Sequence, residues 1–277
     1  PILHGLGVLE FLEAAKADGR IVNAGFSFHG LAEDFKRIID AYPWVFCQIQ
    51  YNYLDETYQA GTEGLRYAAG KGIGVVIMEP LRGGNLGLIT APPAVQAIWD
   101  ESPVRRTPVE WALRWIWNHP EVTVVLSGMN EEAHIAENLA IAGTAEAGAM
   151  TPLELELVAR ASAKYRELMK VGCTGCGYCM PCPMGVSIPM CFETYNKMHM
   201  FGNIAEGKFM YALRMSGEIG SEGPGYASQC VACGQCMENC PQNIAIPEVL
   251  AELAAELEGP DFAQLQEAGR QFLRRTA

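Results

Sequence analysis

Residues 73–84, with the sequence IGVVIMEPLRGG, decide how the first half of this chain folds. The first six of these residues are glycine or apolar, and four of the six are β-branched. A short run of this kind favours a buried strand. Pro80, Gly83 and Gly84 end the run and predict a loop in which the backbone is free to turn.

Strands and helices alternate on both sides of this stretch. Further strand patterns occur at residues 21–29, 45–54 and 122–129. Helical apolar spacing occurs at residues 7–19, 31–42, 62–72, 108–120 and 130–142, and we expect Asn130 to cap the last of these helices. Apolar strands between amphipathic helices predict a parallel sheet covered by helices.

Four strands are clear in this half, and residues 1–4 are a candidate for the tail of a fifth. A (β/α)8 barrel needs eight strands and typically about 250 residues. The first half is therefore either a small open sheet or the C-terminal part of a truncated barrel. Because the chain starts at Pro1 rather than at a methionine, we expect it to be a fragment.

The pattern changes at Thr151 and becomes helical. A helix is predicted over residues 151–172, with Thr151 as N-cap, Pro152 at the first helical position and Glu154 completing a capping box. Further helices are expected at residues 190–215, 247–258 and 260–274, with a loop at residues 216–228. The sequence thus predicts two domains, residues 1–150 and residues 151–277.

Composition excludes several classes of function. The 277 residues carry a formal net charge of −12, and no basic patch is present, so nucleic acid is not an expected partner. No apolar run is long enough to span a bilayer, so no membrane association is expected. Eight of the 10 cysteines lie in two short runs, which indicates metal in a reducing, cytoplasmic compartment rather than a disulfide scaffold.

The two cysteine runs are CTGCGYCMPCP, residues 173–183, and CVACGQCMENCP, residues 230–241. Three thiolates at this spacing can converge on one 4Fe-4S cluster, and the last cysteine of such a run ligates the other cluster in two-cluster ferredoxins. Gly177 and Gly234 would let the backbone approach the inorganic sulfides. We therefore expect two crossed ligand sets: Cys173, Cys176, Cys179 and Cys240 for one cluster, and Cys230, Cys233, Cys236 and Cys182 for the other.

Some alternatives stay open for these cysteines. The first run is one residue shorter before Cys182, so Cys191 is a fallback ligand. Zinc and disulfides are alternatives, although structural zinc usually draws paired cysteines from two separated knuckles. Cys47 lies within a predicted strand and is expected to be an ordinary buried cysteine.

Four segments of the first half are similar to successive segments of an aldo/keto reductase: GRIVNAGFSFHG, CQIQYNYLD, GIGVVIMEPLRGG and SGMNEEAHIAENL. With the cysteine runs behind them, they resemble the bacterial and archaeal branch of that family that carries a C-terminal iron–sulfur domain. The resemblance implies an α/β fold: a partial (β/α)8 TIM barrel, comprising the last four to five strand–helix units. An all-α dicluster domain like the α-helical ferredoxins would follow it.

The resemblance also implies site residues. His4 matches the family's catalytic histidine, whereas its aspartate, tyrosine and lysine lie on early strands that this chain lacks. The implied cofactor contacts are Ser27, His29, Gln48, Pro80, Leu81, Gly83, Gly84, Ser127, Gly128, His134, Glu137 and Asn138. If they do not contact a cofactor, Ser27 and His29 are expected to be ordinary turn residues, and Gln48 is expected to be a polar side chain at the edge of the sheet. His134 stands where relatives that prefer NADPH usually have arginine, and Met78 replaces an aromatic ring.

The implied function is an oxidoreductase that interconverts carbonyl and alcohol groups of a small molecule with NADPH or NADH. Two 4Fe-4S clusters would exchange single electrons with a redox partner protein. Residues 1–277 alone are expected to lack reductase activity. A second reading is an electron-transfer module whose barrel half is a non-catalytic scaffold, and a third is a zinc-stabilised interaction protein.

Overall fold

The structure is a computed structural model that describes residues 5–218 and 223–276. The chain divides into two compact units. The first unit holds the residues up to Ala91 together with Trp99–Ser162, and the second holds Pro92–Ile98 and the residues from Ala163 onward. Among the described residues, no helix is long and apolar enough to cross a bilayer.

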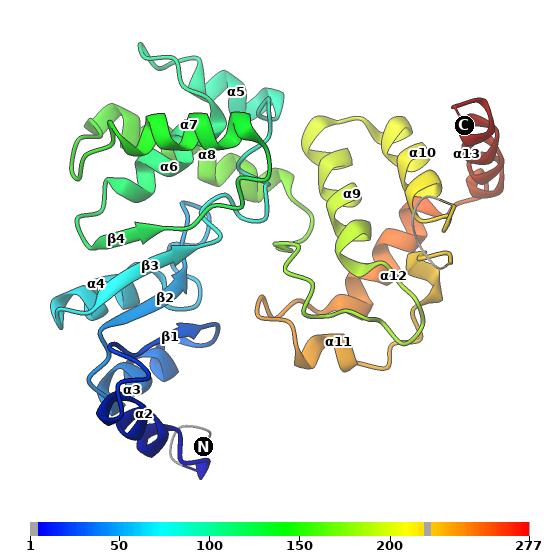
Figure 1. Ribbon diagram of the computed structural model, residues 1–277. Helices are drawn as coiled ribbons and strands as arrows, with labels where there is room; N and C mark the ends of the chain where they lie inside the picture. Colours follow the sequence, from blue (N-terminus) through cyan, green and yellow to red (C-terminus); the bar gives the residue numbers. More distant parts are fainter. Residues whose placement is uncertain (1–4, 219–222, 277) are drawn as a thin grey trace. The chain divides into compact units, whose positions relative to one another are not determined.

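A parallel sheet forms the centre of the first unit, as predicted (Figure 1). Its strands lie in sequence order and are β1 (Gly25–Phe28), β2 (Phe46–Gln50), β3 (Gly74–Met78) and β4 (Val122–Val125). The register pairs Ser27 with Gln48 and Gln48 with Val76. Each strand is shorter than its sequence pattern, and the candidate fifth strand at residues 1–4 lies outside the described residues.

Helices cover one face of this sheet. Helices α3 (Ala32–Ala41), α4 (Gly61–Gly70) and α6 (Pro108–Trp117) pack on the strands, α7 (Glu132–Ala142) packs on α6, and α2 (Val8–Ala17) precedes β1 in the chain. Cys47, Ile49 and Ile77 point toward the covered face and are fully buried. The opposite face is more open, since Phe46 is 40% and Val124 42% exposed there. In a complete (β/α)8 barrel, that second face lines the barrel interior.

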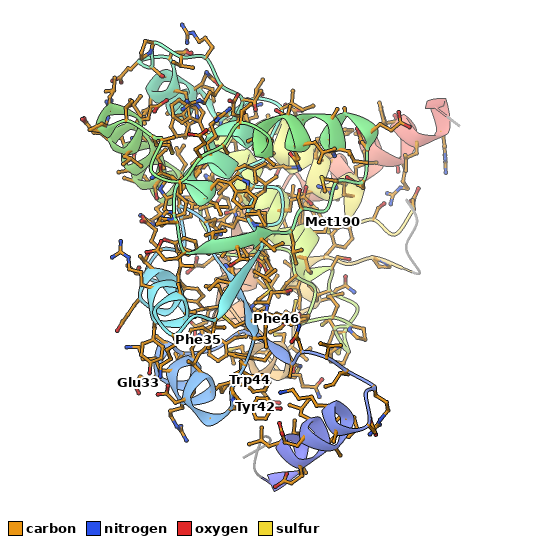
Figure 2. All side chains as sticks on the ribbon, turned by 60° about the vertical axis from the view of Figure 1, so that its left-hand side comes forward. Glu33, Phe35, Tyr42, Trp44, Phe46 and Met190 are labelled. Atoms are coloured by element: carbon orange, nitrogen blue, oxygen red, sulfur yellow. The ribbon has the colours of Figure 1, made fainter. Side chains whose placement is uncertain are left out.

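An aromatic cluster fixes the connection between α3 and β2. Figure 2 labels Phe35, Tyr42, Trp44 and Phe46 in this region. The Trp44 ring lies 4.7 Å from the Tyr42 ring, and its indole nitrogen donates to the Ile38 carbonyl at 2.8 Å. Aromatic pairs of this kind stabilise by about 0.5–1.5 kcal/mol beyond their buried area. The cluster therefore sets where β2 enters the sheet.

The second unit is helical around the cysteine runs (Figure 1). Its helices are α9 (Ile188–Phe201), α10 (Ile204–Arg214), the short η1 (Ala227–Gln229), α11 (Gln235–Glu238), α12 (Ile246–Leu257) and α13 (Phe262–Thr276). Helix α8 (Pro152–Leu168) begins in the first unit and ends in the second. Phe192, Tyr211 and Leu253 are fully buried in the core of this unit.

Several helices differ from the sequence predictions. Helix α5 (Pro93–Trp99) was not predicted. Helix α7 begins one residue later than expected, so its N-cap is Glu131 and the predicted Asn130 cap is wrong. The helix predicted over residues 190–215 is two helices, because Gly202 has a φ of 69° at the end of α9. A left-handed glycine of this kind is a common helix ending.

Candidate functional sites

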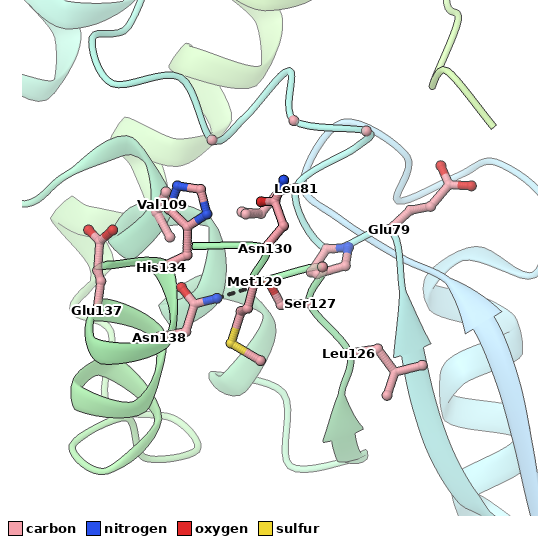
Figure 3. Close-up of a pocket in the computed structure, with 15 residues that line it drawn as sticks. Glu79, Leu81, Val109, Leu126, Ser127, Met129, Asn130, His134, Glu137 and Asn138 are labelled. Carbon is pink, nitrogen blue, oxygen red and sulfur yellow. Dashed lines mark hydrogen bonds between the residues drawn. The ribbon is translucent and has the colours of Figure 1, made fainter. Parts of the chain in front are cut away.

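The first unit contains a cavity of about 590 Å³, which we call the strand-end cavity. It lies where β3 and β4 end, between the loop that begins at Glu79, the loop that begins at Leu126, and the first turns of α7 (Figure 3). In barrels of parallel strands, the carboxyl ends of the strands are where active sites are built. The strand-end cavity is therefore a candidate functional site.

Nine of the twelve predicted cofactor residues line the strand-end cavity: Pro80, Leu81, Gly83, Gly84, Ser127, Gly128, His134, Glu137 and Asn138. Six further lining residues were not predicted: Glu79, Gly87, Val109, Leu126, Met129 and Asn130. Most of the six are chain neighbours of predicted residues. Val109 is the exception, because it comes from α6 and only the tertiary structure brings it to the cavity.

Polar side chains of α7 are held in place at the cavity wall. Asn138 is 9% exposed and donates its amide to the Ser127 hydroxyl at 2.9 Å, which joins α7 to the loop after β4 (Figure 3). Thr107 donates its hydroxyl to Glu137 at 2.6 Å. The His134 ring lies 4.0 Å from the Glu131 carboxylate. The first turns of α7 thus line the cavity with polar side chains, and hydrogen bonds fix the orientation of Glu137 and Asn138.

The loop after β3 turns sharply at the cavity. Gly83 and Gly84 have φ angles of 63° and 89°, and the non-glycine residues Glu79 and Arg82 also have positive φ, at 53° and 50°. A residue other than glycine pays a steric cost for this conformation. Space is not the reason for glycine at position 84, since no atom lies within 4 Å of a Cβ built there. The backbone conformation of the turn is the reason.

A buried polar network holds that loop. One carboxylate oxygen of Asp55 accepts hydrogen bonds from Gln50 at 2.8 Å, Asn52 at 2.9 Å and Arg82 at 3.0 Å. Asp55 and Arg82 are only 6% and 5% exposed. The Arg82 cation therefore pairs with Asp55 and does not line the strand-end cavity. No motif in the sequence pointed to this network.

The other predicted barrel residues do not line the strand-end cavity. Ser27 and Gln48 lie side by side in register on β1 and β2, and Gln48 donates its amide to the Met78 sulfur at 3.3 Å. His29 follows β1, and its Nδ1 lies 3.0 Å from the Gln59 side-chain oxygen. His4 lies outside the described residues.

The second unit has two small cavities, each lined by four cysteines. The first cysteine cavity gathers Cys173, Cys176, Cys179 and Cys240. The second cysteine cavity gathers Cys182, Cys230, Cys233 and Cys236. Each set takes three cysteines from one run and the last cysteine of the other run, which is the crossed arrangement proposed from the sequence. Ile188 lines both cavities.

The residues around these cavities fit an iron–sulfur cluster. Four thiols form a soft donor set, which suits clustered iron. Gly177 and Gly234 have φ angles of 79° and 80°, and the Gly175 amide donates to the Cys173 sulfur at 3.4 Å. Burial, with the neighbouring Cys173 thiol adding to it, raises the pKa of Cys179 to about 12, so binding metal there must displace a proton.

No group of three or more His, Cys, Asp or Glu side chains among the described residues is arranged to hold a metal ion. The ligands of a cubane cluster bind separate iron atoms, so they stand farther apart than the ligands of one ion.

The two remaining cysteines lie away from both cavities. Cys191 is fully buried, and its sulfur lies 3.5 Å from the Gly225 carbonyl oxygen and 3.7 Å from the Met215 sulfur. It lines neither cysteine cavity, so the structure gives no support to Cys191 as a fallback ligand. Cys47 is also fully buried, and burial raises the pKa of its thiol to about 12.

Comparison with known proteins gives two family matches. The model described as "Aldo/keto reductase family" matches residues 3–146, and the model described as "4Fe-4S dicluster domain" matches residues 172–245. No curated protein matches the chain. Similar solved structures include the holo and apo forms of an aldo-keto reductase from Bacillus halodurans, each 21% identical with a TM-score of 0.46. The matches cover 55% of this chain and 54% and 55% of those chains, so this chain spans about half their length.

Proposed function

Since the chain belongs to the aldo/keto reductase family and carries a 4Fe-4S dicluster domain, we propose that it is an oxidoreductase that interconverts carbonyl and alcohol groups of a small molecule with a nicotinamide cofactor. The family and the α/β fold class predicted from the sequence, a partial barrel followed by a helical region, are confirmed. The substrate class, the nicotinamide and the cluster count are our proposal.

One observation carries the nicotinamide proposal: nine residues inferred from resemblance converge on the strand-end cavity. The loop with Gly83 and Gly84 would hold the pyrophosphate together with the free N–H groups at the start of α7. Glu137 and Asn138 would hold the adenine. Ser27, His29 and Gln48 remain the proposed nicotinamide contacts. The bound cofactor would supply hydride transfer, and the chain's own residues would orient it.

The choice between NADPH and NADH depends on positive charge near the ribose. His134 is the single residue on the described lining that can carry such a charge, and a neutral imidazole is a poor partner for a 2′-phosphate. Glu79 and Glu137 also line this cavity and add negative charge to it. We therefore propose that this cavity favours NADH over NADPH.

We further propose two 4Fe-4S clusters, one in each cysteine cavity, with the crossed ligand sets given above. The lining of the cavities supports this assignment. The clusters would exchange single electrons with a redox partner protein. We also propose that the chain has two domains, residues 1–150 and residues 151–277, and a cytoplasmic location. Finally, we propose that residues 1–277 alone show no reductase turnover.

The proposal is tested on anaerobically purified chain. Iron and sulfide analysis with EPR after dithionite should give two clusters, and calorimetry should detect NADH binding. Asn138→Ala, which removes the contact to Ser127, should weaken that binding, whereas Asn23→Ala at an exposed position should not. Zinc without iron would overturn the cluster assignment, and binding that Asn138→Ala leaves unchanged would overturn the cavity assignment.

A second candidate is an electron-transfer module with a non-catalytic barrel scaffold. One observation favours it: each cysteine cavity gathers a full set of four thiols, whereas Ser27, His29 and Gln48 do not line the strand-end cavity. Under this candidate, EPR detects both clusters but neither NADH nor NADPH binds. EPR together with calorimetric titration of NADH and NADPH therefore distinguishes the two candidate functions.

A further inference from the structure

The two cysteine cavities differ in the polarity of their walls. Apart from cysteine, the second cysteine cavity is lined by apolar side chains and glycine only: Pro183, Met184, Ile188, Val231, Gly234, Pro247 and Leu250. The first cysteine cavity also has apolar walls, but Thr174 and Gln242 line it as well. The two cysteine runs are nearly alike in sequence, but the walls of their two cavities therefore differ in polarity.

Thr174 is the clearer of the two differences between the cavity walls. It follows Cys173 directly, and Val231 follows Cys230 at the equivalent place in the other run. Thr174 is 3% exposed, and within the described part of the chain its hydroxyl has no hydrogen-bond partner. Val231 is 60% exposed. A buried hydroxyl without a partner is costly, so a group that occupies the cavity is expected to accept from it.

A cluster bound in the first cysteine cavity would present the sulfur atoms of its thiolates and sulfides as acceptors there. We propose that the Thr174 hydroxyl donates a hydrogen bond to a sulfur of the cluster held by Cys173, Cys176, Cys179 and Cys240. We further propose that this bond gives that cluster a higher reduction potential than its neighbour. The inference rests on the proposed presence of two clusters. A donor to sulfur stabilises the reduced cluster, which carries one more negative charge, and so favours reduction.

The difference in reduction potential would determine which cluster of the second unit is reduced first. Each cluster accepts one electron, from the 2+ to the 1+ level. The first electron from an external donor comes to rest on the cluster beside Thr174, and a second electron then occupies the cluster with the apolar wall. A chain with equal clusters would show no such order.

The test is an anaerobic redox titration of the holo-protein, with dithionite as electron donor and EPR as readout. Thr174→Val, which removes the hydroxyl at nearly constant volume, should lower the midpoint potential of one cluster and leave the other unchanged. Thr174→Ser keeps the hydroxyl and should restore the higher potential. Thr194→Val is the matched control: it makes the same change at a buried position of α9 that lines neither cysteine cavity, so neither potential should move.

Iron and sulfide content is measured first for every variant. If Thr174→Val holds less iron, Thr174→Ala repeats the test, because alanine cannot clash with the cluster. Unchanged potentials in an iron-replete variant without the hydroxyl would overturn this inference alone. Wild-type protein without EPR-active iron would overturn the proposed function, and this inference with it.

Discussion

At the scale of single residues, His134 is the one residue of the described cavity lining that can carry a positive charge. Replacing it with arginine places a permanent, forked cation at the start of α7. We expect His134→Arg to tighten NADPH binding relative to NADH by at least about tenfold, since a hydrogen bond to a charged group contributes about 1.5–3 kcal/mol. Calorimetric titration with each dinucleotide measures the ratio.

Ala136→Arg is the matched control for His134→Arg. Ala136 lies on α7 and is exposed, but it does not line the cavity, so the variant adds the same charge to the same helix. An equal gain in NADPH preference from both variants would show a general effect of charge and contradict the role of position 134.

The ion pair between Asp55 and Arg82 is the main buried charge pair around the loop after β3. Removing one partner leaves the other charge buried and unpaired, which costs about 3–5 kcal/mol. We expect Asp55→Ala to lower the free energy of unfolding of the first unit by about this amount. Urea titration followed by tryptophan fluorescence measures it, because all five tryptophans belong to the first unit.

An exposed pair provides the control for Asp55→Ala. Arg160 and Glu101 form a two-pronged contact at 2.5 and 2.6 Å, but their side chains are 43% and 48% exposed. Water screens such pairs, so Glu101→Ala should cause a much smaller loss of stability. Similar losses from the two variants would show that burial does not decide the strength of the Asp55 pair.

At the scale of elements, the start of α8 links stability to pH. Glu154 is buried, and burial opposes its ionisation. Hydrogen bonds from the Thr151 amide and hydroxyl, at 2.8 and 3.0 Å, and the charge of Arg106 outweigh that effect and hold the pKa of Glu154 below its usual value of 4.5. The ionised carboxylate therefore contributes stability above about pH 4.5, and this is lost as the pH falls through the folded-state pKa.

We expect Glu154→Gln to lower the stability of the first unit at neutral pH by about 1 kcal/mol, because the amide oxygen can still accept from Thr151 but lacks the negative charge that faces Arg106. The variant should also lose less further stability on acidification below about pH 4.5, because its side chain does not titrate. Tryptophan-detected urea titrations over this pH range measure both effects. Glu156→Gln, at an exposed position on the same helix, should keep the wild-type slope; equal slopes for all three proteins would contradict the assignment.

Elements with strong local signals were predicted well. The four strands follow from short apolar runs, which are rich in β-branched residues in β3 and β4, and the capping box of Thr151 and Glu154 follows from its own residues. Helix α5 was missed because its seven residues are too few for a helical period to emerge. Tertiary packing stabilises its end instead, where Trp99 stacks on Trp111 with the ring centroids 4.6 Å apart. Asn130 failed as a cap because the first helical turn sits one residue further on.

At the scale of the whole molecule, the second unit has a core built around its cysteines. Six of the eight cysteines of the two runs pack against that core. Binding energy from a metal cluster is then folding energy. Removing the iron with a chelator and an oxidant should unfold much of residues 163–277, seen as lost helical circular dichroism and faster proteolysis of that region.

Tryptophan fluorescence serves as the internal reference in that experiment, since it reports the first unit. Protein that loses all its iron but keeps its helical signal and its resistance to protease would contradict a structural role for the clusters. The same samples, returned to iron and sulfide, should regain both properties.

The sequence alone determined the family, the parallel sheet, the capping of α8 and the grouping of cysteines into two runs. Each of these signals is local: residue type and spacing along the chain carry it, and no distant contact is needed. Only the tertiary structure decided which residues share a cavity. It brought Val109 of α6 to the strand-end cavity, turned Arg82 away toward Asp55, and buried Thr174 while leaving Val231 exposed. Burial and pairing between distant residues depend on how elements pack, which similar local motifs do not encode.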